Sequence, residues 1–488
     1  MNQNRAHLGQ DATTLRSSVG GALCSAARRH GVVSSSAVFG CRWWALGVAA
    51  LLTLSGAGQT GASPTDRMAQ KASEAAEHAP GLARVEVWAA DAPAPSALGT
   101  AFEVRPGVWL TAWHVVTGAV FSEGMGSQVR LSRPGQAAAT EATLVAFDAI
   151  NDLALLAQAG SAPSAFAAVR WARANGASSE PLVIAGYAEG RSLGSTEARS
   201  GSVVQQAALV RRLLLHGAGS PGQSGGPVLR LGTQPEVVGV VVARGFLSQL
   251  SQAVPAEVAE AFVAVHGSRR IAISPEEARE LLKQQLVQHQ EAVLGEVEHV
   301  LAAPANRRRW LRDWERIRPL DLPCWASTSP VDRDLKVIRT VCTGSAVIDT
   351  ADRAATDLGE VSWSIAKVEL PSAAKPVRRT RALRDLDRMV GAVFDRMQAV
   401  DGKAGAPRCA RAAIAATKPG HERLGAVRLV VCHQQHIKLG LLQLRMVALK
   451  WTSPNTAVVV SWTTDLATPE TAAQYTRLLL TQLEAGTP

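Results

Sequence analysis

Short apolar segments separated by glycine and proline constrain the fold of this chain more than any other feature. They follow one another closely between residues 82 and 266, as ARVEVWAA, GTAFEVR, GVWLTAWHVV, QVRLSRP, EATLVAFD, DLALLAQ, PLVIAGYA, GSVVQQAALV, GPVLRL and EVVGVVVA. Many short strands with turn signals between them are typical of an all-β barrel or sandwich. We expect one such domain over residues 82–270, with a closing helix over 255–266.

The pattern changes to a helical period after residue 270. The sequence Ser274-Pro275-Glu276-Glu277 forms a capping box with proline at the first helical position, and leucines and valines follow at helical spacing. We expect a helical connector over 271–305, with its helix at about 275–303, and then an α+β domain of unknown function over 306–488. Its expected strands lie near 336–349, 359–370, 425–433, 437–450 and 456–463, and its expected helices near 381–399 and 469–485.

The most apolar run of the chain is WWALGVAALLTL, residues 43–54. Arginines precede this run at positions 28, 29 and 42, and small residues follow it. This order is typical of a secretory signal, and the run is shorter than the roughly 20 residues of a spanning helix. We expect residues 1–62 to be an export signal or a retained membrane anchor and residues 63–81 to be a linker. The protein would then be periplasmic or secreted, either free or held at the inner membrane through residues 43–54.

The cysteines fit an exported protein, and the charge fits a solvated surface. Cys324, Cys342, Cys409 and Cys432 lie in the C-terminal region, and no cysteine lies between 42 and 323. In an oxidising compartment these four fit two disulfides, whose pairing the sequence leaves open. The net charge of +10 comes from interleaved signs, which indicates a solvated surface rather than a nucleic-acid interface. We expect no metal, no cofactor and no nucleic-acid partner.

The segment GQSGGP, residues 222–227, places Ser224 between glycines and ahead of an apolar strand. A nucleophilic serine needs a base, a carboxylate that orients the base, and backbone N–H groups directed at the developing oxyanion. Glycine before the serine permits the strained backbone that such a turn requires. The N–H groups of Gly222 and Ser224 are the candidates for the oxyanion site.

A base and a carboxylate are both available in the same domain. An acidic residue at the start of a buried strand is costly unless a partner binds it, and a histidine would be such a partner. The candidate bases are His114, His216 and His266, and the candidate carboxylates are Asp152, which opens the strand DLALL, and Asp148.

The motifs T-A-x-H, D-L-A-L-L and G-x-S-G-G-P, in that order, resemble the trypsin/chymotrypsin superfamily of serine endopeptidases. Short spacings between the motifs, the absence of a cysteine near the histidine and the strand GTAFEV (99–104) are most similar to the bacterial HtrA/DegP-type protease domain. No PDZ pattern is recognisable after it. The resemblance covers residues 82–266 and implies a chymotrypsin-like double β-barrel.

The resemblance also implies roles for individual residues. His114 is the implied general base, Asp152 orients its imidazole, Ser224 attacks the scissile carbonyl, and the N–H groups of Gly222 and Ser224 bind the oxyanion. Gln223 replaces the aspartate that trypsin-like zymogens have before the serine, so activation by a new N-terminal amine is not expected.

The resemblance also implies residues of the substrate pocket. Ala218 would line its base and Val242, in the strand 236–246, would line its wall, which favours a small or medium apolar side chain before the scissile bond. An acidic side chain attracted by His216 and Arg244 is the alternative.

Two other functional classes compete with a serine endopeptidase. One is a catalytically silent protease fold that binds peptides, with the C-terminal domain carrying the function. The other is a serine esterase, which needs a strand-to-helix G-x-S-x-G elbow. The segment after Ser224 leads to a strand, which argues against the esterase.

Overall fold

The computed structural model describes the chain from residue 81 to residue 485, with gaps. The described ranges are 81–89, 92–121, 127–160, 169–173, 178–207, 210–217, 219–232, 234–244, 250–302, 324–332, 335–345, 360–369, 408–414, 427–435, 439–453 and 455–485. The predicted export segment, the linker up to residue 80 and the predicted helix at 381–399 lie outside these residues. None of the helices described here is both long enough and apolar enough to span a membrane.

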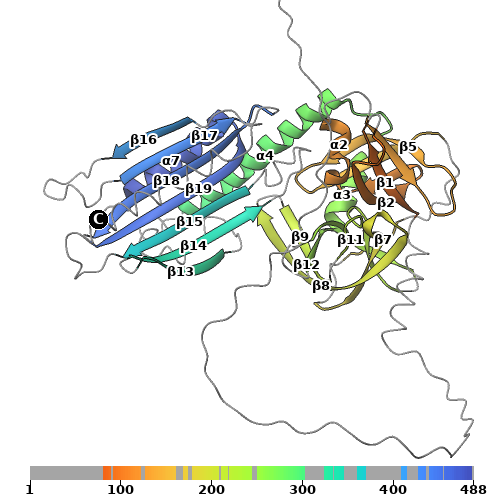
Figure 1. Ribbon diagram of the computed structural model, residues 1–488, viewed down its shortest axis with the longest axis horizontal. Coiled ribbons are helices and arrows are strands. Elements are labelled where there is room, and N and C mark those ends of the chain that lie inside the picture. Colours follow the sequence, from red (N-terminus) through yellow and green to blue (C-terminus); the bar gives the residue numbers. More distant parts are fainter. Residues whose placement is uncertain are drawn as a thin grey trace, which may run out of the picture. The chain divides into compact units, whose positions relative to one another are not determined.

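Six antiparallel strands close into a first barrel in the order β1-β2-β3-β6-β5-β4 (Figure 1). Their inward-facing side chains form the core, in which Phe102, Trp109 and Leu131 are fully buried. The closing pair is β1 with β4, where Val85 lies opposite Leu131. The strands are β1 Leu82–Trp88, β2 Ala97–Arg105, β3 Val108–Thr111, β4 Gln128–Ser132, β5 Thr140–Asp148 and β6 Leu153–Gln158.

A second closed barrel repeats this arrangement in the order β10-β11-β12-β9-β8-β7. Two closed antiparallel barrels confirm the fold that the sequence resemblance implied. The sequence pattern missed β12 and merged the end of β8 with the start of β9, which are separate strands. The strands are β7 Pro181–Tyr187, β8 Leu193–Ala207, β9 Val210–His216, β10 Pro227–Arg230, β11 Glu236–Arg244 and β12 Leu250–Pro255.

Two short helices and a 3-10 turn complete the barrels. The turn η1, Ala188–Gly190, joins β7 to β8. The helix α2, Trp113–Phe121, begins directly after β3, so the segment GVWLTAWHVV is not one strand as predicted. Its valines are buried against the barrel as an apolar helix, a pattern that a short run shares with a strand. The closing helix at 255–266 is confirmed as α3, Ala256–His266.

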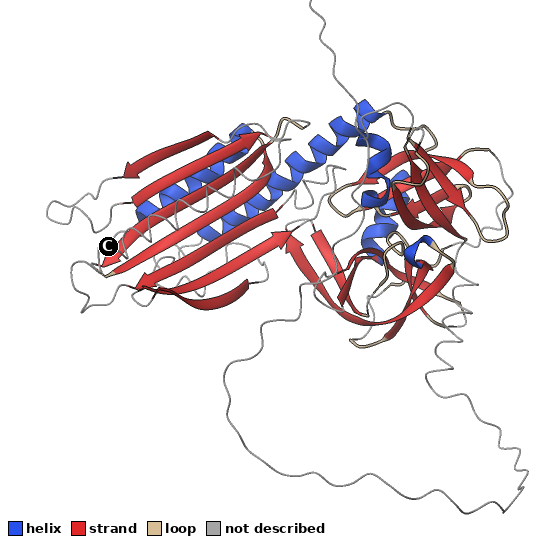
Figure 2. Ribbon diagram, in the orientation of Figure 1, coloured by secondary structure: helices blue, strands red, loops and turns tan. Residues whose placement is uncertain are grey.

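The C-terminal region forms a seven-stranded antiparallel sheet in the order β13-β14-β15-β19-β18-β17-β16, labelled in Figure 1. Figure 2 draws its strands in red. Helix and sheet together confirm the expected α+β class. The sequence pattern missed β13 and β16 and found the other five strands. They are β13 Cys324–Asp332, β14 Leu335–Ser345, β15 Glu360–Glu369, β16 Arg408–Ile414, β17 Val427–Gln435, β18 Leu442–Ser453 and β19 Thr456–Ala467.

Two helices pack against this sheet. Helix α4, Pro275–Ala302, contacts β19, and helix α7, Pro469–Ala485, contacts β18 and β19 (Figure 1). Both begin where the sequence predicted. The Ser274 hydroxyl accepts a hydrogen bond from the Glu277 N–H at 3.1 Å, and the Thr468 hydroxyl accepts one from the Thr471 N–H at 3.1 Å. These bonds satisfy N–H groups that a helix leaves unpaired in its first turn.

One disulfide lies within the described residues, between Cys409 on β16 and Cys432 on β17. The two residues lie directly opposite each other in the strand register. Cys324 and Cys342 are likewise opposite partners in the register of β13 and β14. Their side chains lie outside the described part of the structure, so the second disulfide stays a prediction, now with a pairing to test.

Candidate active site

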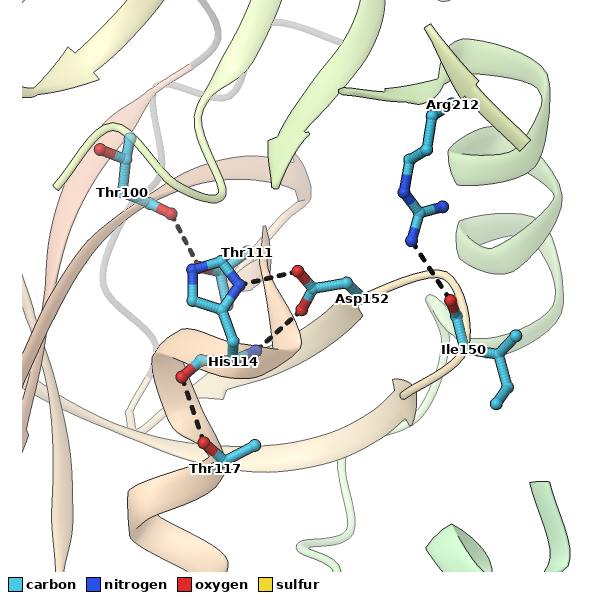
Figure 3. A network of polar contacts seen from close by, with 7 residues as sticks. All are labelled: Thr100, Thr111, His114, Thr117, Ile150, Asp152 and Arg212. Carbon is cyan, nitrogen blue, oxygen red and sulfur yellow. Dashed lines mark hydrogen bonds and ion pairs between the residues drawn. The ribbon is translucent and has the colours of Figure 1, made fainter. Parts of the chain in front are cut away.

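His114 and Asp152 meet at the edge of the first barrel (Figure 3). The Asp152 carboxylate accepts two hydrogen bonds from His114, one from the backbone N–H at 2.8 Å and one from the ring Nδ1 at 2.7 Å. The tautomer in which Nδ1 carries the proton donates to this carboxylate and has Nε2 as the acceptor of the ring. The contact with Asp152 therefore orients the imidazole in a way that suits a general base.

The local structure forces this contact. His114 is the second residue of α2, and Asp152 is the last residue before β6. The Trp113 N–H also donates to the Asp152 carbonyl at 3.2 Å. Asp152 has a φ of 62°, a left-handed conformation that non-glycine residues rarely adopt, and these bonds hold it there. Its side chain is 10% exposed and that of His114 is 29% exposed, so the imidazole faces solvent and the carboxylate does not.

The turn that carries Ser224 packs against the segment that leads to His114. The Ser224 carbonyl accepts a hydrogen bond from the Thr100 N–H at 2.8 Å, and the Thr100 carbonyl accepts one from the Thr111 hydroxyl at 2.7 Å. A Cβ atom on Gly225 would lie 2.4 Å from that hydroxyl and 2.7 Å from the Ala112 nitrogen. The glycine after the serine is thus required, because any side chain would separate the two barrels at this point.

The turn before Ser224 fixes the orientation of the Gly222 N–H. The Gln223 N–H donates to the Ser220 carbonyl at 3.1 Å, and Gly222 has a φ of 90°. Proline at the second position and a positive φ at the third are the features of a type II turn. The Pro221 carbonyl accepts a hydrogen bond from the Glu189 N–H at 2.5 Å. Because carbonyl and N–H point in opposite directions across a trans peptide, the Gly222 N–H is turned away from Glu189.

Two backbone donors are left at this turn. Among the hydrogen bonds of the described residues, none uses the N–H of Gly222 or that of Ser224. A Cβ atom on Gly222 would lie 2.3 Å from the Tyr187 carbonyl oxygen, so glycine is required there for space as well as for its φ. An arrangement of two unpaired N–H groups beside a serine can stabilise an oxyanion.

Gln223 holds the same turn from inside the second barrel. Its side chain is fully buried, and its Oε1 accepts hydrogen bonds from the Ser220 N–H at 2.8 Å and from the Thr196 hydroxyl at 3.2 Å. The glutamine therefore binds the backbone of its own turn. This contact supports the expectation that the turn needs no new N-terminal amine.

The other candidate residues lie elsewhere. His216 is exposed at the end of β9, and His266 ends α3, where it packs on Phe262 with ring centroids 5.1 Å apart. Burial, and then the charge of Arg269, lower the pKa of His266 below its ordinary value. The Asp148 carboxylate caps its own turn by accepting the N–H groups of Ile150 and Asn151, so it is not the residue that binds His114.

The described residues do not include both of the predicted pocket residues. Ala218 and the side chain of Arg244 lie outside the described residues, and Val242 is buried on β11 among apolar neighbours. The assignment of Ala218 and Val242 to a substrate pocket stays a prediction.

Sequence reasoning missed a buried arginine beside the pair. Arg212 on β9 is 4% exposed, and its guanidinium donates to the Ile150 carbonyl at 3.3 Å, two residues before Asp152 (Figure 3). Burial lowers the pKa of Arg212, while the charges of Asp152 and Asp148 oppose that shift. The signal was a charged residue in the strand VRRLLLH, which the sequence pattern did not recognise as a strand.

The comparisons with known proteins agree with this geometry. Residues 99–240 match the family model of the trypsin-like peptidase domain, so the chain contains such a domain. The matched range begins within β2, ends within β11 and contains His114, Asp152 and Ser224. No curated protein matches the chain.

Several solved structures resemble part of the chain. The active form of the Rv3671c protease from M. tuberculosis is 21% identical, with a TM-score of 0.34, over 41% of this chain and 86% of that one. A serine endoprotease from Yersinia pestis is 17% identical, with a TM-score of 0.33, over 40% of this chain and 65% of that one. An HtrA-type protease, AlgW, with a tripeptide is 21% identical, with a TM-score of 0.33, over 40% of this chain and 64% of that one. The assignment of a peptidase domain rests on the family match and on the two barrels.

Proposed function

We propose that this protein is an exported serine endopeptidase that uses Ser224, His114 and Asp152. The observation that carries the proposal is the hydrogen-bonded His114–Asp152 pair at 2.7 Å, beside a serine turn with two unpaired N–H groups. A serine hydroxyl, an imidazole and a carboxylate that orients the imidazole are the parts that acyl transfer requires.

In the proposed reaction the Ser224 hydroxyl attacks the carbonyl carbon of a peptide bond. Its proton passes to Nε2 of His114, and the Asp152 carboxylate stabilises the imidazolium that forms. The N–H groups of Gly222 and Ser224 bind the negative oxygen of the tetrahedral intermediate. The imidazolium then gives its proton to the leaving amine as the C–N bond breaks. Water, activated by the same imidazole, hydrolyses the acyl-enzyme and restores the Ser224 hydroxyl.

The competing proposal is a silent protease fold that binds peptides. It predicts that at least one part of the machinery is missing or misoriented. The paired His114 and Asp152 argue against it, because a binding module has no need to hold an imidazole in the tautomer of a base.

The test is the degradation of unfolded casein by the full chain. We expect Ser224→Ala and His114→Ala each to lower the rate by at least a thousandfold, in line with the cost of losing a triad member. The control His299→Ala replaces an exposed histidine of α4 and should retain the rate. Sequencing the products should show small or medium apolar residues before the cleaved bonds, as Ala218 and Val242 predict. Casein cleavage that survives Ser224→Ala, or no cleavage by the folded wild-type protein, contradicts the proposal.

We propose further that residues 1–62 direct the chain out of the cytoplasm. Support comes from the basic residues before the apolar run 43–54 and the small residues after it. N-terminal sequencing of the mature protein from a bacterial periplasm should show cleavage within residues 55–64, or an uncleaved chain in the inner-membrane fraction. An uncleaved chain in the cytoplasm would contradict export while leaving the peptidase proposal intact.

A further inference from the structure

A helix beyond the matched peptidase domain binds the turn that leads to Asp152. The side-chain amide of Gln285, on α4, accepts a hydrogen bond from the Ala149 N–H at 2.8 Å and donates one to the Phe147 carbonyl at 2.9 Å. A glutamine amide offers one acceptor and a donor, and here it satisfies both backbone groups at the end of β5. Buried backbone groups of this kind need partners, and Gln285 is a partner for both.

Other polar groups of the turn from Phe147 to Asp152 are hydrogen-bonded as well. The Asp148 carboxylate accepts the N–H groups of Ile150 and Asn151, and the Ile150 carbonyl accepts the Arg212 guanidinium. Gln285 supplies the contacts at the start of this turn. A residue outside the two barrels therefore binds the turn that precedes Asp152.

The same helix also packs close to His114. Phe147 stacks on Trp113, the residue before His114, with ring centroids 4.1 Å apart and an interplanar angle of 15°. Leu282 and Leu286 of α4 are fully buried in the apolar cluster that contains both rings. Helices α2 and α4 are in contact as well. The helix that carries His114 and the turn that leads to Asp152 are thus both in contact with α4.

The next turns of α4 bind the C-terminal sheet. The Thr464 hydroxyl of β19 donates to Oε1 of Gln290 at 2.8 Å, and both side chains are buried. Gln285 and Gln290 lie in one continuous helix, so the same helix binds the peptidase turn and the C-terminal sheet.

We infer that Gln285 is a positioning residue for the proposed peptidase and that α4 makes the C-terminal domain part of its catalytic scaffold. The inference rests on the proposed function, because the position of Asp152 matters to catalysis only if the pair serves as a base. Asp152 has a left-handed φ, and a turn that relaxes at Phe147 and Ala149 would let that residue leave this conformation. The carboxylate would then move away from Nδ1 of His114.

The test compares Gln285→Met with Gln284→Met in the full chain. Methionine keeps the length and the helix propensity of glutamine but loses both hydrogen bonds. Gln284 precedes it on the same helix and is exposed, which makes it a matched control. With casein-derived peptides as substrate, we expect Gln285→Met to lower kcat about tenfold to a hundredfold with KM unchanged, because a small misplacement of a catalytic group has this cost. Gln285→Glu keeps the acceptor for the Ala149 N–H and loses the donor to the Phe147 carbonyl. Its kcat should therefore lie between that of Gln285→Met and that of Gln284→Met.

A second readout does not need turnover. The proton between Nδ1 of His114 and the Asp152 carboxylate should give a ¹H NMR resonance far downfield of the amides, because a short hydrogen bond to a charged group deshields it. We expect this resonance to shift or broaden in Gln285→Met and to stay unchanged in Gln284→Met.

The outcomes separate the two proposals. Wild-type kcat and an unchanged resonance in a folded Gln285→Met variant would overturn the positioning role, even if its melting temperature falls. If the wild-type protein cleaves nothing, the proposed function fails, and the resonance still decides whether Gln285 positions the pair. If Gln285→Met does not fold, the same comparison is made with Gln285→Glu.

Discussion

Asp152 has a strained backbone, and its carboxylate accepts two hydrogen bonds from His114. Its φ of 62° costs about 1 kcal/mol or more for a residue with a Cβ atom. The contacts of its carbonyl with Trp113 and of its carboxylate with His114 offset that cost. Strain of this kind persists only where the surroundings fix it, and it gives the carboxylate a direction that an ordinary strand residue would not have.

The buried guanidinium of Arg212 interacts electrostatically with Asp152. No ion pair within the described residues joins the Arg212 guanidinium to a carboxylate, yet the charges of Asp152 and Asp148 act against the burial that lowers the pKa of Arg212. A buried charge without compensation is costly. With Arg212 buried nearby, the negative charge of Asp152 should therefore contribute to the stability of the fold as well as to the proposed chemistry.

A double-mutant cycle tests this dependence. We expect Asp152→Asn to lower the free energy of unfolding by about 1–2 kcal/mol more in the wild-type background than in Arg212→Met, where the buried charge is gone. Urea denaturation of the four proteins measures the difference. Additivity of the two substitutions within about 0.3 kcal/mol would show that the arginine does not sense the carboxylate.

At the residue scale, the three sequence motifs together predicted the candidate site, which no single residue could have done. The serine turn and the order of histidine, aspartate and serine pointed to one site, and the structure brings the histidine and aspartate into hydrogen-bond contact. Arg212 and Gln285 could not be predicted. Each acts through a long-range contact, from β9 or from α4 to one turn, and no local pattern marks such a residue.

At the scale of elements, α4 carries a buried histidine. His289 is fully buried, and neither ring nitrogen has a hydrogen-bond partner among the described residues. Burial lowers the pKa of His289 to about 4 from its ordinary value of 6.5. Between these two values the unfolded chain binds a proton that the folded chain does not, so stability falls as the pH falls through this window and is level below it.

The size of this effect follows from the shift. We expect the stability advantage of His289→Leu over the wild-type protein to grow by about 2 kcal/mol between pH 8 and pH 5. Urea denaturation at the two pH values measures it, with the exposed His299→Leu as the control that should show no such change. If wild type and His289→Leu lose stability equally between pH 8 and pH 5, the histidine is not buried in its neutral form.

The elements that the sequence predicted are those with strong local signals. The capping box predicted at Ser274 is confirmed at the start of α4, and α7 begins at its predicted position with the Thr468 hydroxyl bound to the Thr471 N–H. The strands that were missed lack such signals. Edge strand β16 contains alanines and arginines, and β12, LSQAVP, alternates weakly. The helix α2 was taken for a strand because a short apolar run has no clear period.

At the scale of the whole molecule, the proposed site exists only when both barrels are folded together. His114 and Asp152 come from the first barrel and Ser224 from the second. Hydrogen bonds cross between the barrels, from the Thr100 hydroxyl to the Gly222 carbonyl at 2.7 Å and from the Arg84 guanidinium to the Gly190 carbonyl at 2.8 Å. We therefore expect the reactivity of Ser224 to report on the folded state of both barrels and not on either one alone.

The most direct measurement is the reaction of the full chain with a fluorophosphonate probe, followed by peptide mapping. Such a probe reacts with a serine only where a base removes its proton and nearby N–H groups bind the oxygen of the adduct. We predict one adduct, on Ser224, that disappears in His114→Ala. An unmodified Ser224 in well-folded protein, or an adduct that forms equally well without His114, would contradict the account.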